Sequence, residues 1–238
     1  MPSGFREGFV EADGFRIRYM ESGQGPPLVH LHGAGGVRLT RAHELLSQRY
    51  RVVVFEMPGF GESPENTRTA TLSELATTMA AAVTQLGIDQ FNLMGTSFGA
   101  RVALWLGLRQ PERALALVLE APAAIRPEGH QLPSTLDAKH RALVSRLRGP
   151  DRDFQLEAAM RNLPTPTLVL FGTHDRLMPP EMGRHYKELL PNCHLVFVYH
   201  AGHTISVDRP EALADVTADF LERREAFVIN RAETVINP

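Results

Sequence analysis

Several features that define large protein classes are scarce or missing in this sequence. Its 238 residues include a single cysteine, Cys193, so neither an internal disulfide nor a cysteine-based metal cluster can form, which fits a reducing compartment. No run of about 18 apolar residues, the length needed to span a membrane, occurs in the sequence. The first residues are also not followed by the apolar region of a signal peptide. We therefore expect a cytoplasmic protein with neither an export signal nor a membrane partner.

An excess of charge of one sign is also missing. The chain has 25 Lys and Arg against 27 Asp and Glu, which gives a formal net charge of −2. The most basic stretch, residues 139–148, is flanked by Asp137 and Asp151, as expected of a solvated helix face. Because a nucleic-acid binder needs a basic surface, we expect no nucleic-acid partner.

Short apolar segments, turns and helical patterns follow one another along the chain. This alternation is typical of an α/β fold in which a mostly parallel sheet, here of eight strands, has helices on both faces. Asp13-Gly14 predicts a hairpin between the first two strands. The predicted strands span residues 9–12, 15–19, 28–32, 52–55, 91–94, 115–119, 167–171 and 195–198, and the predicted helices 38–48, 71–86, 98–110, 180–190 and 208–224.

One connection is much longer than the others. Residues 122–164 join the sixth and seventh predicted strands, far above the usual length of such a loop. Helical periodicity recurs near 136–147 and 154–160 within it, so we expect a small helical lid inserted between core segments 1–121 and 165–238. The tail, residues 225–238, carries apolar residues that must dock on this subunit or another, which leaves open a homodimer through the lid or the tail.

A sharp strand-to-helix turn is predicted at Gly95-Thr96-Ser97-Phe98-Gly99. An apolar strand precedes this segment and a helical pattern follows it. Small residues two positions before and after Ser97 are needed because the backbone approaches itself closely in such a turn. The pattern favours Ser97 as an exposed nucleophile.

Three further segments complete a constellation for acyl transfer. The glycine-rich segment 32–36 directly follows a strand and leaves backbone N–H groups free for an oxyanion. Asp175 and His203 each come just after a later strand. The order Ser97, Asp175, His203 is the one expected when a catalytic triad is built on the carboxyl ends of a parallel sheet.

With these motifs, and with Pro58-Gly59-Phe60-Gly61 after the fourth strand, the chain resembles the α/β-hydrolase fold superfamily over nearly all of residues 8–224. The resemblance implies Ser97 as nucleophile, His203 as base and acid, and Asp175 as its orienting partner. It also implies an oxyanion hole from the backbone N–H groups of Ala34 and Phe98.

Two departures from the family pattern stand out. Glu56 precedes the Pro-Gly turn where many relatives have Asp. Ala100-Arg101 follow the sharp turn at Ser97 where many relatives have a second glycine. We expect neither departure to involve a residue that takes part in the catalytic reaction. Glu120, at the end of the sixth strand, is an alternative triad acid, since some relatives supply the acid from that position. The lid is shorter than the four-helix caps of many relatives.

Substrate-binding residues are predicted around the sharp turn at Ser97 and the glycine-rich segment 32–36. His30 alternates with apolar strand residues and is expected to be a hydrogen-bonded core histidine. His174, His194 and His200 show no pairing with carboxylates four residues away, so a metal site is not expected, and no cofactor is expected either. The predicted substrate-binding residues are Gly33, Gly35, Phe60, Met94 and Ile125.

A serine nucleophile indicates acyl transfer through an acyl-enzyme. The simplest such reaction is hydrolysis of short-chain carboxylic esters, with a small-molecule ester as partner. A C–C bond hydrolase of the meta-cleavage type would use the same triad, although similar relatives are expected to have Trp directly after the histidine, where this chain has Thr204. A cofactor-free perhydrolase, an acyltransferase and a non-catalytic ligand receptor remain as alternatives.

Overall fold

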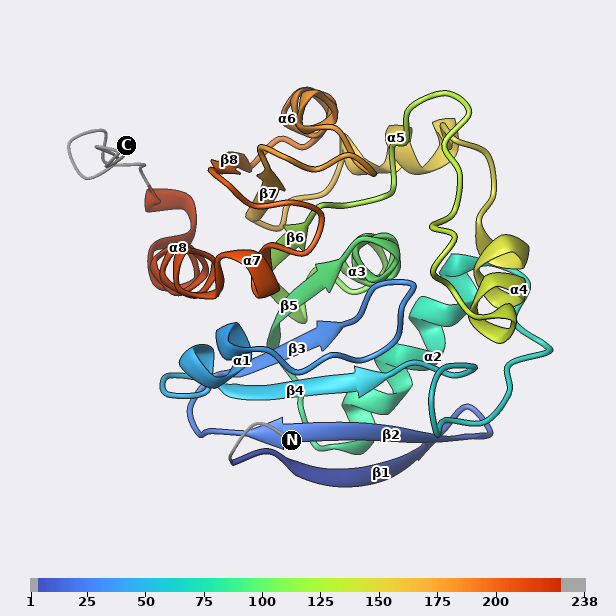
Figure 1. Cartoon of the computed structure of the whole chain (residues 1–238). Helices are drawn as coiled ribbons and strands as arrows, with labels where there is room; N and C mark the ends of the chain where they lie inside the picture. Colours follow the sequence, from blue (N-terminus) through green and yellow to red (C-terminus); the bar gives the residue numbers. More distant parts are fainter. Residues whose placement is uncertain (1–3, 228–238) are drawn as a thin grey trace.

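A single sheet of eight strands forms the centre of the structure, a computed structural model that describes residues 4–227. The strands are β1 (Arg6–Ala12), β2 (Phe15–Ser22), β3 (Pro27–Leu31), β4 (Arg51–Glu56), β5 (Phe91–Thr96), β6 (Ala114–Glu120), β7 (Thr167–Gly172) and β8 (Cys193–Val198). Their order is β1-β2-β4-β3-β5-β6-β7-β8 (Figure 1). β2 is antiparallel to both β1 and β4, and the other neighbours are parallel. The predicted mostly parallel eight-stranded sheet is confirmed.

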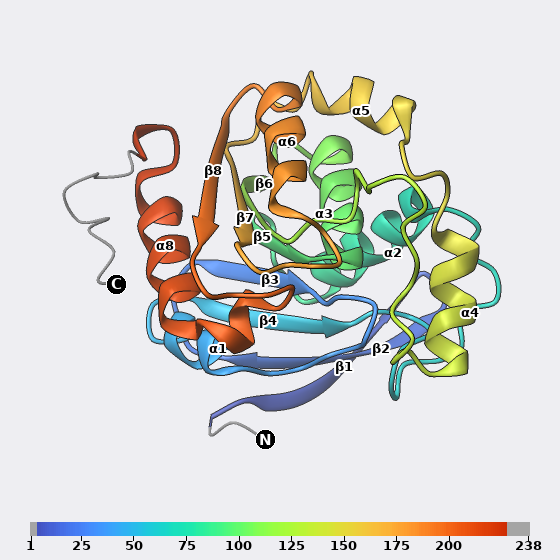
Figure 2. The same cartoon turned by 45° about the horizontal axis from the view of Figure 1, so that its top comes forward.

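Helices cover both faces of this sheet. They are α1 (Arg41–Leu46), α2 (Leu72–Gln85), α3 (Phe98–Arg109), α4 (Ala138–Leu147), α5 (Phe154–Met160), α6 (Gly183–Leu189), α7 (Ile205–Asp208) and α8 (Pro210–Arg223), with short 3₁₀ helices at Pro180–Met182 and Arg224–Ala226. α2, α3 and α6 pack on one face, and α1 and α8 on the other (Figure 2). None of these helices is long and apolar enough to cross a membrane.

Side chains of the central strands point alternately into two separate hydrophobic cores. On β3, Leu28 lies in the core under α1 and α8, whereas Val29 and Leu31 lie in the core under α2 and α3. This follows from the two-residue period of a strand, and burial on both faces explains why the strands read as continuous apolar runs. The polar loops are therefore confined to the strand ends, and those after β3, β5, β7 and β8 meet at one edge.

The segment between β6 and β7 contains α4 and α5, and we refer to residues 122–164 as the lid segment. Leu143, Val144 and Leu147 form the buried side of α4, as its periodicity predicts. Arginine side chains satisfy many backbone carbonyls in and beside this segment. Arg126 donates to the carbonyls of Ala123, Gly149 and Pro150, Arg148 to that of His130, and Arg146 to those of Asn66 and Thr69.

The predicted docking of the C-terminal tail concerns residues 228–238, which lie outside the described residues. Phe227, the last described residue, is buried against Phe220 and His194. The lid-and-core division and the predicted homodimer contact remain predictions.

Candidate active site

Ser97 occupies a strained turn between β5 and α3. Its backbone has φ +53° and ψ −109°, which is a conformation that a residue with a side chain rarely adopts. A side chain at Gly95 would lie 2.6 Å from the Cα of Ala100, and one at Gly99 would lie 2.1 Å from the carbonyl oxygen of Leu31. Only glycine fits at these two positions, so the local sequence permits the turn that exposes the Ser97 hydroxyl.

The three side chains expected to form a triad lie in one hydrogen-bonded row. His203 Nε2 is 2.9 Å from Ser97 Oγ, and His203 Nδ1 is 2.8 Å from Asp175 Oδ2. They come from three different loops, after β5, β7 and β8. The arrangement allows His203 to take a proton from Ser97 while Asp175 holds the Nδ1–H tautomer.

Asp175 is fixed by more than the histidine. Its side chain is fully buried, and its Oδ1 accepts hydrogen bonds from the N–H groups of Leu177 and Met178 at 2.8 and 2.9 Å. Oδ2 is thereby left for His203. Because both carboxylate oxygens have partners, the buried charge is compensated and the orientation of His203 is determined.

Backbone N–H groups suited to an oxyanion lie beside Ser97. Phe98 is the first residue of α3, so its N–H has no acceptor within the helix. Ala34 lies in the turn after β3, which is closed by a hydrogen bond from the Gly36 N–H to the Gly33 carbonyl. Both Phe98 and Ala34 line the same cavity as Ser97.

His32 holds this glycine-rich turn against the loop after β4. Its Nδ1–H donates to the Gly33 carbonyl at 2.7 Å, and its Nε2 accepts from the Met57 N–H at 3.1 Å. Burial lowers the pKa of His32 to about 4, which keeps the ring neutral and lets it donate and accept at once. His32 is therefore a structural link and not a base.

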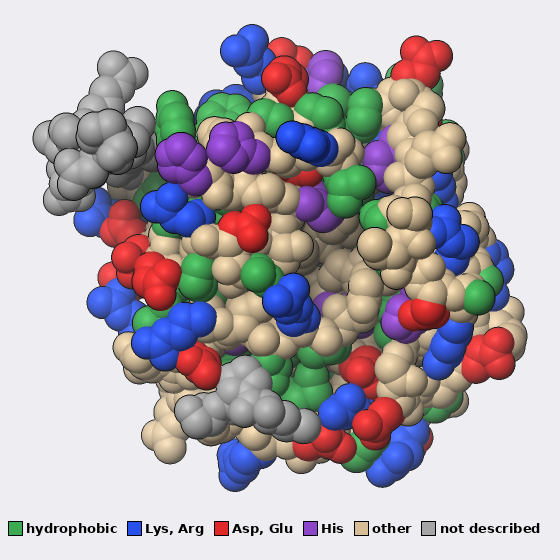
Figure 3. Space-filling model, in the orientation of Figure 1, with side chains coloured by type: hydrophobic (Ala, Val, Ile, Leu, Met, Phe, Trp, Pro, Cys, Tyr) green, Lys and Arg blue, Asp and Glu red, His purple; other side chains and the backbone are tan. Residues whose placement is uncertain are grey.

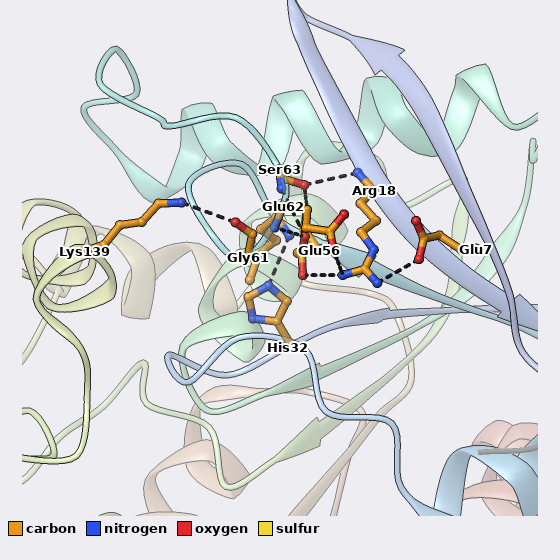
Figure 4. Close-up of polar contacts among 9 residues, drawn as sticks. Glu7, Arg18, His32, Glu56, Gly61, Glu62, Ser63 and Lys139 are labelled. Carbon is orange, nitrogen blue, oxygen red and sulfur yellow. Dashed lines mark hydrogen bonds and ion pairs between the residues drawn. The ribbon is translucent and has the colours of Figure 1, made fainter. Parts of the chain in front are cut away.

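Glu56 organises the loop after β4. Its carboxylate accepts hydrogen bonds from the N–H groups of Glu62 and Ser63 and faces the Arg18 guanidinium (Figure 4). A side chain at Gly61 would lie 2.0 Å from Glu56 Oε1, so the glycine and the longer acid fit one another. In this loop Glu56 acts on the backbone and has no contact with Ser97 or His203.

A cavity of about 460 Å³ opens at Ser97 and His203. Figure 3 shows the molecular surface hollowed near the centre of this face, with histidine side chains around the hollow. Leu132, Leu136 and Val144 of the lid segment line one side of the cavity.

Two of the five predicted substrate-binding residues, Gly33 and Gly35, line this cavity; the other three do not. Phe60 is fully buried, with its ring packed on His32 and His140. Met94 points into the core under α1 and α8. Ile125 is buried with its N–H bonded to the Tyr186 hydroxyl. The structure places these three side chains away from the cavity lining, because side-chain direction along a strand or loop depends on packing that the motif does not encode.

Beside Ser97, five polar residues form a buried chain of hydrogen bonds with one direction. The Thr40 N–H donates to His43 Nδ1, so His43 Nε2–H donates to His30 Nδ1 at 2.8 Å. His30 Nε2–H then donates to the Thr96 hydroxyl, which donates to Glu120 Oε2 at 2.6 Å. We call these residues the buried relay. Burial lowers the pKa of His30 and His43, the latter to about 4, which keeps both rings neutral.

Glu120 ends the buried relay and is not hydrogen-bonded to His203. Its other oxygen, Oε1, accepts from the Ser206 N–H at 2.7 Å. Burial raises the pKa of Glu120, and its hydrogen bonds to Thr96 and Ser206 partly oppose that rise. The geometry therefore sets Asp175, rather than Glu120, against the histidine.

One residue that the sequence analysis set aside lies at the site. Arg101 was expected not to touch the chemistry, yet it lines the cavity, one helical turn after Ser97. The signal was its place on the first turn of the helix that follows the nucleophile, because helical side chains lean towards the N-terminal end of the helix. Within residues 4–227, no group of three His, Cys, Asp or Glu side chains could hold a metal ion; the absence of a metal or cofactor stays a prediction.

Comparison with known proteins gives one family. Residues 26–149 match the family described as alpha/beta hydrolase fold, and residues 106–216 match the alpha/beta hydrolase family. The chain is 24% identical to a 2-hydroxy-6-oxo-6-(2'-aminophenyl)hexa-2,4-dienoic acid hydrolase of Metapseudomonas resinovorans, over 93% of each chain. It is 28% identical to a 2-hydroxymuconate semialdehyde hydrolase of a Pseudomonas species, over 93% of this chain and 95% of that one.

A solved structure of a bacterial membrane phospholipase A superposes with a TM-score of 0.81 at 25% identity. The match covers 92% of this chain and 86% of that one.

Proposed function

The chain belongs to the alpha/beta hydrolase fold family, and from that premise we propose that it is a serine hydrolase that cleaves short-chain carboxylic esters. The observation that carries the proposal is the row of hydrogen bonds from Ser97 through His203 to Asp175 at the wall of a cavity. A hydroxyl activated in this way is suited to nucleophilic attack on a carbonyl group.

In the first half of the reaction, Ser97 Oγ attacks the ester carbonyl carbon and its proton moves to His203 Nε2. The carbonyl oxygen becomes an oxyanion that accepts hydrogen bonds from the N–H groups of Ala34 and Phe98. Collapse of the tetrahedral intermediate breaks the bond to the alcohol oxygen, which takes the proton from His203. The acyl group then remains on Ser97 as an ester.

In the second half, a water molecule gives a proton to His203 Nε2 and attacks the acyl carbon. Collapse of this second intermediate releases the carboxylic acid, and Ser97 Oγ regains the proton from His203. Asp175 stays ionised throughout and stabilises the imidazolium form of His203.

The size of the acyl group follows from the cavity and the short lid segment. The cavity measures about 460 Å³, within the usual range for small-molecule sites. We expect activity to peak between acetyl and hexanoyl groups, because methylenes that extend past the lid segment remain in water and gain little of the roughly 0.8 kcal/mol that each obtains on burial. The likeness to a phospholipase A supports ester hydrolysis, not this chain length.

A direct test uses p-nitrophenyl butyrate and the variant Ser97→Ala. We expect steady turnover by the wild type and a loss of roughly 10⁴ to 10⁶ in kcat in the variant, since no other group can form the acyl-enzyme. Ser145→Ala, in an exposed position of α4, is the matched control and should keep full activity. If Ser97→Ala retains more than about a tenth of the activity, Ser97 is not the nucleophile.

Hydrolysis of a C–C bond is the second candidate. It is favoured by two relatives with near full-length matches, which are named as hydrolases of a hexadienoic acid and of a muconate semialdehyde. Thr204, which directly follows His203, favours ester hydrolysis instead, because hydrolases of the meta-cleavage type are expected to have Trp at this position. Turnover of 2-hydroxy-6-oxo-6-(2'-aminophenyl)hexa-2,4-dienoic acid at a higher kcat/KM than any simple ester would establish the C–C reaction instead.

A further inference from the structure

Arg101 has an unusual environment for a charged residue. Only 3% of its surface is exposed, and its Nε has no hydrogen-bond partner. Within residues 4–227 no acidic side chain forms an ion pair with it. Burial of an uncompensated guanidinium is strongly unfavourable, so the site is incomplete without a negative group.

Two arginines and one acid carry the charges near Arg101, and the acid, Asp153, forms no ion pair with it but accepts hydrogen bonds from the N–H groups of Gln155 and Leu156. Arg126 and Arg148 lie beside it and share a single carboxylate, that of Asp151. Four arginines line the cavity, with Arg38 as the fourth, and no Asp or Glu within residues 4–227 does. Burial and the neighbouring Arg126 lower the pKa of Arg101 to about 9, so the side chain is still charged at neutral pH.

The position of Arg101 connects this charge with the nucleophile. Arg101 lies on the first turn of α3, Ser97 directly precedes that helix, and both line the same cavity. A helical side chain leans towards the N-terminal end of its helix, which for Arg101 is the end next to Ser97. His203 must deliver a proton to the leaving alcohol, so the alcohol lies on the His203 side. The charged neighbours of Arg101 belong instead to the lid segment, and we assign the acyl group to that side of the cavity.

We propose that the Arg101 guanidinium binds a carboxylate at the far end of the acyl chain, so that the preferred substrate is a half-ester of a dicarboxylic acid rather than a neutral ester. This substrate class rests on the proposed function, since it assigns the acyl group that Ser97 accepts. The planar guanidinium can hold both carboxylate oxygens at once, which gives direction as well as charge.

The test compares monoethyl adipate with ethyl hexanoate, whose acyl chains have the same number of carbon atoms, by acid release at constant pH. We expect the wild type to prefer the anionic ester at least tenfold in kcat/KM. Arg101→Gln should reduce this ratio at least tenfold, and Arg101→Lys should restore part of it. Arg109→Gln, on the same helix but exposed, is the control and should leave both rates unchanged. An equal ratio in wild type and Arg101→Gln would overturn the proposal.

Calorimetry separates failure of this inference from failure of the proposed function. Adipate is titrated into Ser97→Ala, and into the double variant that also carries Arg101→Gln, so that no turnover is needed. Adipate binding that depends on Arg101, with no ester turnover by the wild type, would refute the esterase and keep the anion site. Turnover of ethyl hexanoate, with no adipate binding, would keep the esterase and refute the anion site.

Discussion

Two buried polar regions flank Ser97, and they differ in how their polar groups are satisfied. In the buried relay, each residue between Thr40 and Glu120 donates to the next, and the last carboxylate also accepts from Ser206. Arg101 is equally buried but has an Nε without a partner. A buried network that is complete serves the fold, whereas a buried charge that lacks a partner is a place for a ligand. The two regions should therefore respond to substitution in opposite ways.

The largest expected effect is a loss of kcat, and it distinguishes whether Glu120 is part of the buried relay or of the catalytic triad. Asp175→Asn should reduce kcat by about 10⁴, because an amide cannot hold His203 in the required tautomer. Glu120→Gln should change kcat little but destabilise the fold by about 1–3 kcal/mol, since one of its two donors loses an acceptor. Esterase kinetics and urea unfolding of both variants provide the measurement. The reverse pattern of kcat losses would transfer the acid role to Glu120.

The second prediction concerns acid, which should destabilise the fold through His43 of the buried relay and through His32, which lies outside it. His32 and His43 have an ordinary pKa of 6.5 and a folded pKa of about 4, so between these values the unfolded chain binds protons that the folded chain does not. Stability is therefore complete above pH 6.5 and is lost as the pH falls towards 4, by about 1.4 kcal/mol per pH unit for each histidine.

Urea unfolding at several pH values measures this slope. His43→Gln should reduce this slope by about one proton, whereas substitution of His185, a half-exposed histidine on α6, by Gln should leave it unchanged. A free energy of unfolding that stays constant between pH 6.5 and 4.5 would show that these rings are protonated in the fold.

The smallest expected effect has the opposite sign. Arg101→Met replaces an uncompensated charge by an apolar side chain of similar length, so the variant should be more stable than the wild type. We expect the Tm to rise by a few degrees, because about 1 kcal/mol corresponds to roughly 2–4 °C in a chain of this size. Thermal unfolding with Arg109→Met as the control measures the difference. A lower Tm for Arg101→Met would place Arg101 with the satisfied structural groups.

The elements and the triad residues could be predicted because their signals are local. Buried parallel strands read as apolar runs, and the turn at Ser97 needs glycines at fixed positions. The pairing of His30 with His43 could not be predicted, since it depends on how a six-residue helix packs on the sheet. The direction of Met94 could not be predicted for a related reason: its motif gives its distance from Ser97 along the chain but not the face of the sheet to which it points.

Arginine side chains hold the lid segment in place by donating to backbone carbonyls, and much of its length lies outside α4 and α5. A segment of this kind has no strand register to preserve. We expect that its exposed residues can be exchanged while the sheet and the three catalytic loops remain as they are, provided that the buried side of α4 is kept and each loop carbonyl keeps a donor. New acyl specificities should therefore be easier to obtain by redesigning residues 122–164 than by altering the walls that the sheet contributes.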